Sequence, residues 1–414
     1  MSELQRVIVV GASYAGLRAA EALRRSGFTG ELVMIGAEPH LPYDRPTLTK
    51  AALAAAPDPD VIALPLPASL GEVTWRLRAR VTSSDLDAHT ITLDDGTDLS
   101  FDGLVIATGL RSRHLPIPWE PPRLAIRDLD DNTRLRAAMQ RSLSSGRRMV
   151  VVGAGFIGCE VAAVGAGLGL DVTVVAPERV PLLQAVGEQL GAALQRRHEA
   201  SGVRFLLGQV ATAVRGSEGD AEVELSDGLT LDADVVVEAV GCSPIVDWLG
   251  GSGLDLSDGV LADTHLRVLG GPTSEQMPRP DVVVCGDVAR FPNALFDEVP
   301  RRVEHWTMAA DTGKRAGRTL GLHLTGAGPD EKPFTPVPTF WSEQYDLRLQ
   351  SFGLPQLGSD AAVLEGSLDD GLDQGVVVGY HRDGLLAGVV MVGFEPRYRY
   401  YRTAIGQPST QLLP

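Results

Sequence analysis

The chain has 414 residues, more than the roughly 300 at which one hydrophobic core stops growing, so it predicts two or three domains. Its formal net charge of −16 disfavours nucleic acid and anionic membranes as partners. The three cysteines form no Cys-x-x-Cys pair, which argues against a disulfide framework, a metal site and a dithiol redox centre. They favour a reducing compartment, and we expect a cytoplasmic protein.

The first predicted unit is β-α-β. An apolar strand over residues 6–10 starts almost at the N-terminus and leaves no room for an export signal. A glycine turn, a helix to about residue 25 and a strand over residues 31–35 follow. Continuous apolar strands of this kind are typical of parallel sheets that are covered on both faces.

The turn of this unit, residues 11–16, resembles the start of a dinucleotide-binding fold. There, glycines allow a tight turn and a close approach of pyrophosphate, and the free N–H groups of the helix N-terminus bind the anion. Gly11 and Gly16 fit the pattern, whereas Ser13 replaces the middle glycine, so the phosphate must tolerate a hydroxymethyl group. Glu38 is predicted to bind ribose hydroxyls, although a solvated loop acid is the simpler alternative.

The next stretch, residues 75–98, is rich in β-forming residues and contains a hairpin signal at Asp94-Asp95-Gly96. Residues 103–109 form a buried strand that ends in a glycine turn. The proline-rich residues 115–122 are predicted to be a linker.

A second unit of the same kind begins at residue 149. Its strand leads into Gly153, Gly155 and Gly158, which match the fingerprint fully, and then into a helix to about residue 168 and a strand over 171–175. Residues 149–170 have the length of a membrane span, but Glu160 near their centre and the glycines favour a strand, a turn and a buried helix. Two copies in one chain are much stronger evidence than one.

The coenzyme of the second unit is less clear from the sequence. The position directly after its second strand is Ala176, and the nearest candidates to bind the ribose are Glu178 and Arg179. Glu178 favours the free ribose diol of NADH, whereas Arg179 would accept the 2′-phosphate of NADPH. We expect NADH, with NADPH as the alternative.

The remaining chain predicts a valine-rich strand over residues 233–240 that ends at Gly241, and a strand over 281–285 followed by Gly286 and Asp287. The carboxylate of Asp287 is placed to accept hydrogen bonds from a ribityl chain. A helical stretch over residues 303–322 follows, and residues from 335 onward have strand character and resemble a separate small domain.

Several stretches together resemble the FAD-dependent ferredoxin reductases, the reductase components of bacterial oxygenase systems. These proteins are similar to putidaredoxin and rubredoxin reductases and, more distantly, to apoptosis-inducing factor. The stretches are the Ser13 turn, residues 41–50 (LPYDRPTLTK), residues 107–109, the Gly153 turn, Gly286-Asp287, residues 304–306 and residues 340–346 (FWSEQYD). The similarity spans nearly the whole chain.

The resemblance implies an α/β fold with two Rossmann-like dinucleotide-binding domains, of glutathione-reductase-like architecture, and a small C-terminal α+β domain. The FAD domain is expected over residues 1–115 and 243–322, the NAD(H) domain over 116–242 and the C-terminal domain over 323–414. The residues expected to bind FAD or NADH are Gly11, Ser13, Ala15, Gly16, Glu38, Arg45, Lys50, Val81, Ala107, Thr108, Gly109, Arg111, Gly153, Gly155, Phe156, Ile157, Gly158, Glu160, Glu178, Gly241, Gly286, Asp287, Trp306 and Trp341.

Three of these residues are expected to act in catalysis. By resemblance, Trp341 lies near the isoalloxazine, and Glu160 faces the nicotinamide and pairs with Lys50. A buried acid and ammonium stabilise each other only as a pair, which supports the pairing; the simpler alternative is a helix acid and a lysine in solvent. The sequence departs from the family at Met308 and Thr312, where Asn and Gln are usual, and mildly at Thr47 and Thr49, which replace Pro and Ser.

The resemblance implies a reductase that takes hydride from NADH onto FAD and passes single electrons to a small acidic ferredoxin, of 2Fe-2S or similar type, which feeds a monooxygenase or dioxygenase. Alternatives are a reductase of monodehydroascorbate or a quinone, and an NADH-sensing flavoprotein that controls association. A monomer or a homodimer is expected. The candidates for docking an acidic partner are Arg301 and Arg302, then Lys314, Arg315 and Arg318, and then Arg397, Arg399 and Arg402.

Overall fold

The computed structural model describes residues 5–270, 277–369 and 372–408. The chain forms two compact units. Unit 1 consists of Met1–Asp44, Ile62–Arg111 and Ser243–Pro338, and unit 2 of Arg45–Val61, Ser112–Cys242 and Thr339–Pro414. In the described part of the chain, no helix is both long and apolar enough to cross a membrane.

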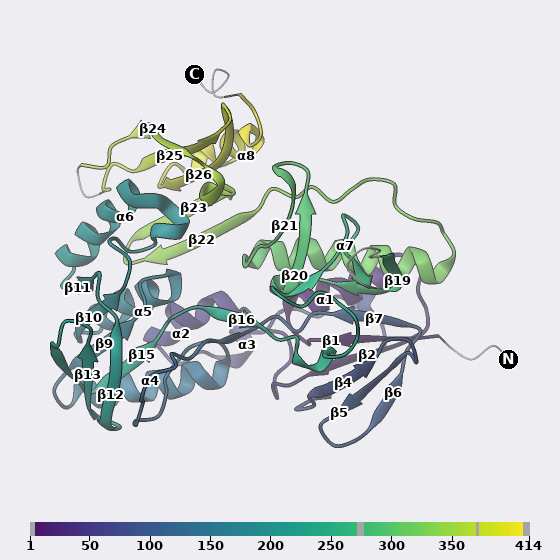
Figure 1. Ribbon diagram of the computed structural model, residues 1–414, viewed down its shortest axis with the longest axis horizontal. Helices are drawn as coiled ribbons and strands as arrows, with labels where there is room; N and C mark the ends of the chain where they lie inside the picture. The colour runs from purple at the N-terminus through teal and green to yellow at the C-terminus, as the bar shows by residue number, and fades with distance from the viewer. Residues whose placement is uncertain (1–4, 271–276, 370–371, 409–414) are drawn as a thin grey trace. The chain divides into compact units, whose positions relative to one another are not determined.

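Unit 1 is built on a six-stranded sheet with the order β18-β19-β7-β1-β2-β3 (Figure 1). Its strands are β1 (Arg6–Val10), β2 (Glu31–Gly36), β3 (Thr74–Leu77), β7 (Gly103–Ile106), β18 (Arg267–Gly270) and β19 (Met277–Val284). β1 runs parallel to β2 and β7, and β7 runs parallel to β19. The carboxyl ends of these four strands therefore lie at one edge of the sheet, which is the edge that binds ligands in open α/β folds.

In unit 1, helices α1 (Tyr14–Arg25) and α7 (Trp306–Thr325) pack with their backbones in close contact. A Cβ atom added at Gly313 would lie 2.5 Å from the carbonyl oxygen of Ala15, and one at Gly317 would lie 2.0 Å from that of Ala19. Glycines one turn apart on α7 thus allow the contact, and any side chain there would force the helices apart. The packing positions the N-terminus of α1.

Two small sheets complete unit 1. They contain β4 (Val81–Asp85), β5 (Thr90–Leu93) and β6 (Asp98–Ser100), and β17 (Val260–Leu261), β20 (Ala289–Asn293) and β21 (Asp297–Arg302). Two of the points where the chain passes from one unit to the other lie in β8 (Leu110–Ser112) and β16 (Cys242–Pro244). The predicted hairpin at Asp94-Asp95-Gly96 is confirmed, because it connects β5 and β6.

Unit 2 contains a four-stranded parallel sheet with the order β11-β10-β9-β15. The strands are β9 (Arg148–Val152), β10 (Asp171–Ala176), β11 (Arg204–Leu207) and β15 (Val235–Glu238), and the helices are α4 (Leu129–Leu143), α5 (Phe156–Gly167) and α6 (Leu183–Ala200). A smaller antiparallel sheet contains β12 (Ala211–Ser217), β13 (Asp220–Leu225) and β14 (Thr230–Ala233). The short α2 (Ala51–Ala54) also belongs to unit 2, and α3 (Pro59–Ile62) lies at the boundary of the units.

The C-terminal part of unit 2 is a five-stranded antiparallel sheet with the order β22-β23-β26-β25-β24 and a short helix (Figure 1). The elements are β22 (Thr339–Gln344), β23 (Leu347–Gly353), β24 (Asp360–Gly366), β25 (Val376–Arg382), β26 (Leu385–Val392) and α8 (Tyr398–Ala404). Leu190 and Leu194 of α6 share a hydrophobic cluster with Val378 and Val390 of this sheet. Helix α6 is thereby held on the sheet by buried apolar side chains.

The predicted fold class is confirmed, and both β-α-β units lie where the sequence placed them. The strand predicted over residues 233–240 is shorter, because β14 ends at Ala233 and β15 covers only Val235–Glu238. The division into three domains stays a prediction. In the compact units, residues 45–61 and the C-terminal sheet both group with the second β-α-β unit.

Candidate active site

The first nucleotide cradle lies in unit 1, at the carboxyl edge of its large sheet. Gly11 has φ +122°, and a Cβ atom there would lie 2.0 Å from the carbonyl oxygen of Ala107. Gly16 approaches the turn equally closely, because its Cβ atom would lie 2.0 Å from the carbonyl oxygen of Gly11. Both glycines are therefore required by the local backbone, before any ligand is considered.

The start of α1 is open to an anion. Ser13 is the N-cap residue, yet its side chain makes no capping hydrogen bond, and the first turn, which contains Ala15, carries no acidic residue. Free N–H groups and the positive end of the helix dipole suit a pyrophosphate. The residues present thus fit the dinucleotide that the sequence predicts.

Glu38 lies two residues beyond the end of β2, at the same edge of the sheet. Its carboxylate accepts a hydrogen bond of 2.6 Å from the hydroxyl of Tyr43, and its carbonyl oxygen accepts one of 3.1 Å from the N–H of Arg78. Tyr43 comes from the LPYDRP stretch, so part of this family-like stretch fixes the acid that is predicted to bind ribose.

Two further loops reach this edge because their strands are parallel to β1. Ala107, Thr108 and Gly109 follow β7, and the hydroxyl of Thr108 donates to the carbonyl oxygen of Ile245 at 2.7 Å. Gly286 and Asp287 follow β19. A Cβ atom at Gly286 would lie 2.9 Å from that of Ala15, so this loop lies directly against the first turn of α1.

Thr312 shows how the departure from the family in α7 is accommodated. Its hydroxyl donates to the carbonyl oxygen of Met308 at 2.6 Å and accepts from the N–H of Gly286 at 2.9 Å. The residue therefore holds the Gly286-Asp287 loop in place. At the start of α7, the ring of Trp306 stacks on that of Tyr14 with centroids 4.4 Å apart.

Val81 and Arg111, which are also predicted to bind a cofactor, lie elsewhere in unit 1. The side chain of Val81 is buried in the hydrophobic core at the start of β4, so its predicted role would need the main chain. Arg111 is exposed and forms an ion pair with Asp247. The roles predicted for both residues stay predictions.

The second cradle lies in unit 2 at the carboxyl edge of β9. Cβ atoms added at Gly153 and Gly158 would lie 2.3 Å from the carbonyl oxygen of Ala239 and 2.0 Å from that of Gly153. A Cβ atom at Gly155, by contrast, would meet no atom within 4 Å. Gly155 is the N-cap of α5 without a side-chain cap, and no acid lies in the first turn. An exposed, open helix N-terminus of this kind fits the phosphates of a second dinucleotide.

Three more residues predicted to bind a cofactor surround this turn. Phe156 and Ile157 begin α5 and are partly exposed, and the ring of Phe156 packs edge-on against that of Phe340 with centroids 4.8 Å apart. Gly241 follows β15 with φ +91°, and its carbonyl oxygen accepts from the N–H of Arg113 at 2.9 Å.

Glu178 is the structural counterpart of Glu38. The carbonyl oxygen of Glu178 accepts from the N–H of Gly208 at 3.1 Å, as that of Glu38 accepts from Arg78, and Ala176 corresponds in the same way to Gly36. Ala176 is therefore the last residue of β10 and not the position of the expected acid. Arg179, the residue that favoured NADPH, forms an ion pair of 2.8 Å with Glu188.

Lys50 and Glu160 form the predicted pair inside unit 2. The Nζ atom of Lys50 lies 2.8 Å from Oε2 of Glu160, and their side chains are only 14% and 6% exposed. Glu160 also accepts hydrogen bonds from the hydroxyl of Thr49, on Oε2, and from that of Ser342, on Oε1 at 2.6 Å. Nζ of Lys50 donates to the carbonyl oxygen of Pro46 at 3.1 Å. The buried ionic pair is thus fully hydrogen-bonded, as its desolvation requires.

Arg45 and Trp341 complete the predicted set. Arg45 begins the same short helical turn as Thr49, and its guanidinium donates to the carbonyl oxygen of Arg127. Trp341 is partly exposed, and on β22 it alternates with the buried Phe340 and Ser342, so it leaves the opposite face of the strand from the hydroxyl that contacts Glu160. The proximity of Trp341 to the isoalloxazine stays a prediction.

The sequence reasoning missed Thr49 and Ser342 as ligands of Glu160. Both lie in the stretches that carried the resemblance, so a signal was present. Thr49 replaces the usual Ser of the family and keeps the hydroxyl, which explains why this departure is mild. Ser342 was missed because only the tertiary structure brings β22 next to α5.

Burial lowers the pKa of His198 on α6, against the effect of a hydrogen bond to Gln344. The unfolded chain therefore takes up a proton below about pH 6.5 that the folded chain does not. We expect the free energy of unfolding to fall as the pH drops below that value, by at most about 1.4 kcal/mol per pH unit for this one group. Urea unfolding of the wild type and of His198→Gln at several pH values measures this term, and parallel pH profiles for the two would contradict it.

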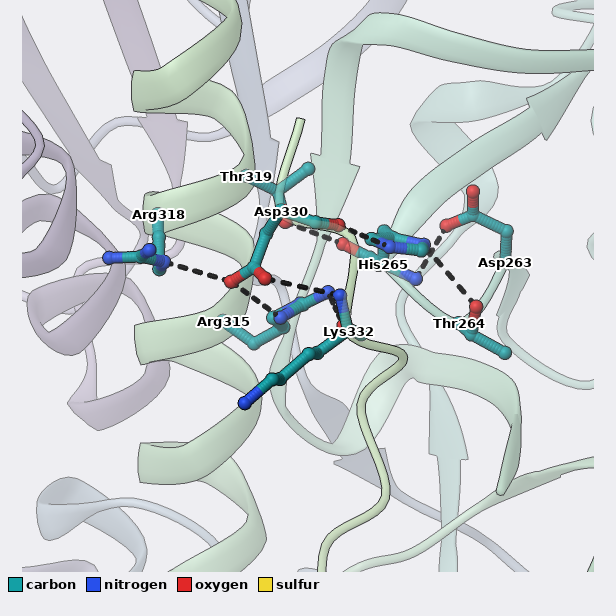
Figure 2. A network of polar contacts seen from close by, with 8 residues as sticks. All are labelled: Asp263, Thr264, His265, Arg315, Arg318, Thr319, Asp330 and Lys332. Carbon is teal, nitrogen blue, oxygen red and sulfur yellow. Dashed lines mark hydrogen bonds and ion pairs between the residues drawn. The ribbon is translucent and has the colours of Figure 1, made fainter. Parts of the chain in front are cut away.

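Two of the basic groups predicted to dock a partner are neutralised. Arg302 is only 10% exposed and pairs with Asp258 and Glu304, and Arg301 pairs with Asp297. On α7, Arg315 is also 10% exposed, and both it and Arg318 bind the carboxylate of Asp330 (Figure 2). Lys314 lies 3.5 Å from Asp311. Acids within the same unit thus occupy the cations of both groups.

Comparisons with known proteins show the family of the chain. Residues 5–313 match the model of the pyridine nucleotide-disulphide oxidoreductases, and residues 339–411 match that of the reductase C-terminal domain. The chain belongs to the pyridine nucleotide-disulphide oxidoreductase family. This family and the ferredoxin–NAD(+) reductases within it use FAD and a nicotinamide nucleotide, as the two cradles require.

Relatives within the family are reductase components. The chain is 33% identical to rhodocoxin reductase of Rhodococcus erythropolis over 380 residues, which cover 88% of this chain and 82% of that protein. It is 35% identical to the ferredoxin–NAD(+) reductase component of the anthranilate 1,2-dioxygenase system of Burkholderia cepacia over 361 residues, which cover 86% and 84%.

Solved structures of similar proteins extend the comparison. A ferredoxin reductase from Rhodopseudomonas palustris matches with a TM-score of 0.81 and 31% identity, covering 94% of this chain and 91% of that one. Putidaredoxin reductase in its covalent complex with putidaredoxin matches with a TM-score of 0.84 and 26% identity, covering 99% and 96%.

The family name includes disulphide chemistry, but the cysteines of this member do not support it. Cys159, Cys242 and Cys285 form no disulfide with one another, and burial raises the pKa of the thiols of Cys159 and Cys285, the latter to about 12. Protonated, buried thiols are poor nucleophiles. The buried thiols of Cys159 and Cys285 therefore do not favour a thiol route.

Proposed function

We propose that this protein is an NADH-dependent ferredoxin reductase, in which hydride from NADH reduces FAD and single electrons then pass to an iron–sulfur ferredoxin of an oxygenase system. The observation that carries the proposal is the pair of open helix N-termini, at Ser13 and Gly155, together with the buried Lys50–Glu160 pair close to the second. Two relatives, rhodocoxin reductase and a ferredoxin–NAD(+) reductase component, support the identity of the electron acceptor.

Each cradle has a separate task in this proposal. The turn of α1, Glu38 and Asp287 would hold FAD, and the turn of α5 and Glu178 would hold NADH. Bound FAD supplies the ability to accept two electrons as hydride and to give them up one at a time. The protein contributes binding, orientation and electrostatics.

The role that we assign to the Lys50–Glu160 pair follows from its burial. The ammonium of Lys50 lies beside a carboxylate in a site with little solvent, and its positive charge would stabilise negative charge on the reduced flavin. Glu160 holds the ammonium in one place through Oε2. The carboxylate of Glu160 also makes the N-terminal half of α5 polar on the side that faces β22.

The decisive experiment is an anaerobic titration of the FAD-loaded protein with NADH and, separately, with NADPH, followed by loss of the flavin absorbance. We expect stoichiometric reduction by NADH and much weaker binding of NADPH, because Glu178 would repel a 2′-phosphate and Arg179 is paired with Glu188. Glu178→Ala is expected to reduce the preference for NADH. Protein that neither contains FAD nor can be reconstituted with it would refute the proposal, and equal affinity for both nucleotides would refute the role of Glu178.

The docking surface for the ferredoxin is proposed on α8. Within the described residues, Arg399 and Arg402 are exposed and form no ion pair, and the neighbouring Arg397 lies 3.5 Å from Glu365. The basic residues at positions 301, 302, 314, 315 and 318 are paired with acids. Of the three groups of basic residues predicted as docking sites, the group on α8 therefore keeps free positive charge. A free basic face on an acidic protein suits a small acidic partner.

Reversal of these charges tests the docking surface. Arg399→Glu combined with Arg402→Glu is expected to slow ferredoxin-dependent reduction of cytochrome c about tenfold at low salt, and to leave ferricyanide reduction unchanged. The matched control is Arg134→Glu with Arg141→Glu on α4, which changes the net charge equally at other exposed positions. If both double variants slow the reaction equally, net charge and not a docking surface on α8 explains the effect. If neither slows it, the ferredoxin docks elsewhere.

A further inference from the structure

A row of buried polar side chains extends from Glu160 through unit 2. Ser342 and Gln344 lie two residues apart on the inward face of β22, and His198 lies near the end of α6; all three are almost completely buried. Tyr345 follows in the turn between β22 and β23. Buried polar groups need hydrogen-bond partners, and here each group finds the next one in the row.

The direction of the hydrogen bonds is determined by the carboxylate at one end. The carboxylate of Glu160, which forms an ion pair with Lys50, can only accept, so the hydroxyl of Ser342 donates to it at 2.6 Å. The oxygen of Ser342 must then accept from Nε2 of Gln344, at 3.1 Å. This orients the amide, so that Oε1 of Gln344 accepts from Nε2 of His198 at 2.8 Å.

The same logic determines the tautomer of His198. Because burial lowers the pKa of the ring, it is neutral, and a neutral ring with hydrogen on Nε2 has a bare Nδ1 atom. The hydroxyl of Tyr345 lies 3.0 Å from Nδ1 and is therefore the donor. Burial raises the pKa of Tyr345 to about 12, so this donor keeps its proton.

Every donor in the row Tyr345–His198–Gln344–Ser342 thus points toward Glu160. Hydrogen bonds aligned in one direction polarise and strengthen one another. The amide of Gln344 does not pass on protons as a hydroxyl or a water molecule does. The row is suited to holding the carboxylate in place and not to conducting a proton.

The far end of the row is anchored, and its backbone is unusual. Tyr345 has φ +57°, a conformation that is unfavourable for a bulky side chain and that persists where surrounding contacts impose it. The adjacent Asp346 forms an ion pair with Arg197, which also pairs with Asp373. These contacts attach the β22–β23 turn to the end of α6, next to His198.

We propose that Ser342, Gln344, His198 and Tyr345 are positioning residues for hydride transfer: they hold the Glu160 carboxylate, and through it the Lys50 ammonium, in one orientation. The inference rests on the proposed function. It extends the site to α6 and the C-terminal sheet. Of the three residues that the sequence predicts to act in catalysis, only Trp341 lies on either of them.

The test uses Gln344→Met, which is nearly isosteric, and Tyr345→Phe, which removes one hydroxyl. The limiting rate of flavin reduction by NADH should fall about tenfold in Gln344→Met and about threefold in Tyr345→Phe, with little change in the Kd for NADH. In a Glu160→Gln background, the same substitutions should have no further effect. The matched control is Tyr380→Phe, since the hydroxyl of Tyr380 also binds α6, at the carbonyl oxygen of Val186, but lies outside the row.

A second readout does not depend on activity. Nitrogen NMR of the histidine rings should show His198 with a protonated Nε2 and a bare Nδ1, and Tyr345→Phe should shift the Nδ1 resonance while Tyr380→Phe should not. The opposite tautomer, or rates that fall equally in Tyr380→Phe, would overturn the inference. A wild type that NADH does not reduce would instead overturn the proposed function, and the NMR result would still report on the row.

Discussion

Glu160→Gln is expected to slow the reduction of the bound flavin by NADH about 100-fold, an effect in the range found when a group that stabilises developing charge is removed. The amide keeps the size of the side chain but leaves the ammonium of Lys50 without its buried counter-charge. It also presents an N–H group to the hydroxyls of Thr49 or Ser342, which then lose an acceptor. Stopped-flow mixing under anaerobic conditions measures the rate.

The partner variant and a control make this result specific. Because the two residues act as a pair, Lys50→Met should cause a loss of similar size, and the double variant should lose little more than either single one. The control is Glu199→Gln, which should reduce normally: Glu199 is an exposed acid on α6 whose carboxylate accepts a hydrogen bond from the side chain of Gln195. An unchanged rate in Glu160→Gln, with FAD content intact by visible spectrum, would remove the pair from the site.

Gly155→Val is expected to raise the Kd for NADH about 30-fold or more and to leave folding and FAD content unchanged. A Cβ atom at Gly155 would meet no atom within 4 Å, and φ −79° with ψ −171° is a backbone conformation that valine accepts, so the main cost falls on the ligand. The branched side chain would keep phosphate from the N–H groups of α5, and a loss of about 2 kcal/mol in charge-assisted hydrogen bonds corresponds to this factor.

Two other substitutions in the same turn separate an effect on NADH binding from an effect on folding. Gly155→Ser should weaken NADH binding only slightly, because the first cradle has Ser13 at the equivalent position. Gly153→Ala should destabilise the whole turn, since its Cβ atom would lie 2.3 Å from the carbonyl oxygen of Ala239 and φ is +112°. Calorimetry gives the Kd, and thermal unfolding separates the two glycines. Normal NADH binding by Gly155→Val would show that the α5 N-terminus does not hold the coenzyme.

The position of the acid in the second cradle shows what the sequence could predict and what it could not. Counting from the glycine turn placed the acid near residues 176–179 but could not choose among them. The pairing of β9 with β10, and the hydrogen bond from Gly208 to Glu178, establish Glu178 as the counterpart of Glu38. Strand ends predicted from a sequence are accurate only to a residue or two, whereas the pairing of strands in the sheet defines the register. The sequence therefore could not show which residue takes the position of the acid.

The basic residues give the opposite case. Sequence charge alone made Arg301, Arg302 and the α7 group equal to the α8 group as docking sites. The structure distinguishes them, because Asp258, Asp297 and Asp330 neutralise the first two groups, and only the folded chain brings Asp258 next to Arg302 and Asp330 next to Arg315. The sequence therefore gives only the number of charged residues. The folded structure shows which of them are neutralised by a nearby acid and which remain available to attract another protein.

The sequence by itself determined the two β-α-β units, their glycine turns and the Lys50–Glu160 pair, since strand periodicity, turn chemistry and family-specific stretches are local signals. The tertiary structure alone decided what surrounds that pair. Thr49, Ser342, Gln344 and His198 come from segments up to about 300 residues apart, and no local pattern links them. Their contacts arise because α5, α6 and β22 pack together, and packing of distant segments depends on the shape of the whole unit.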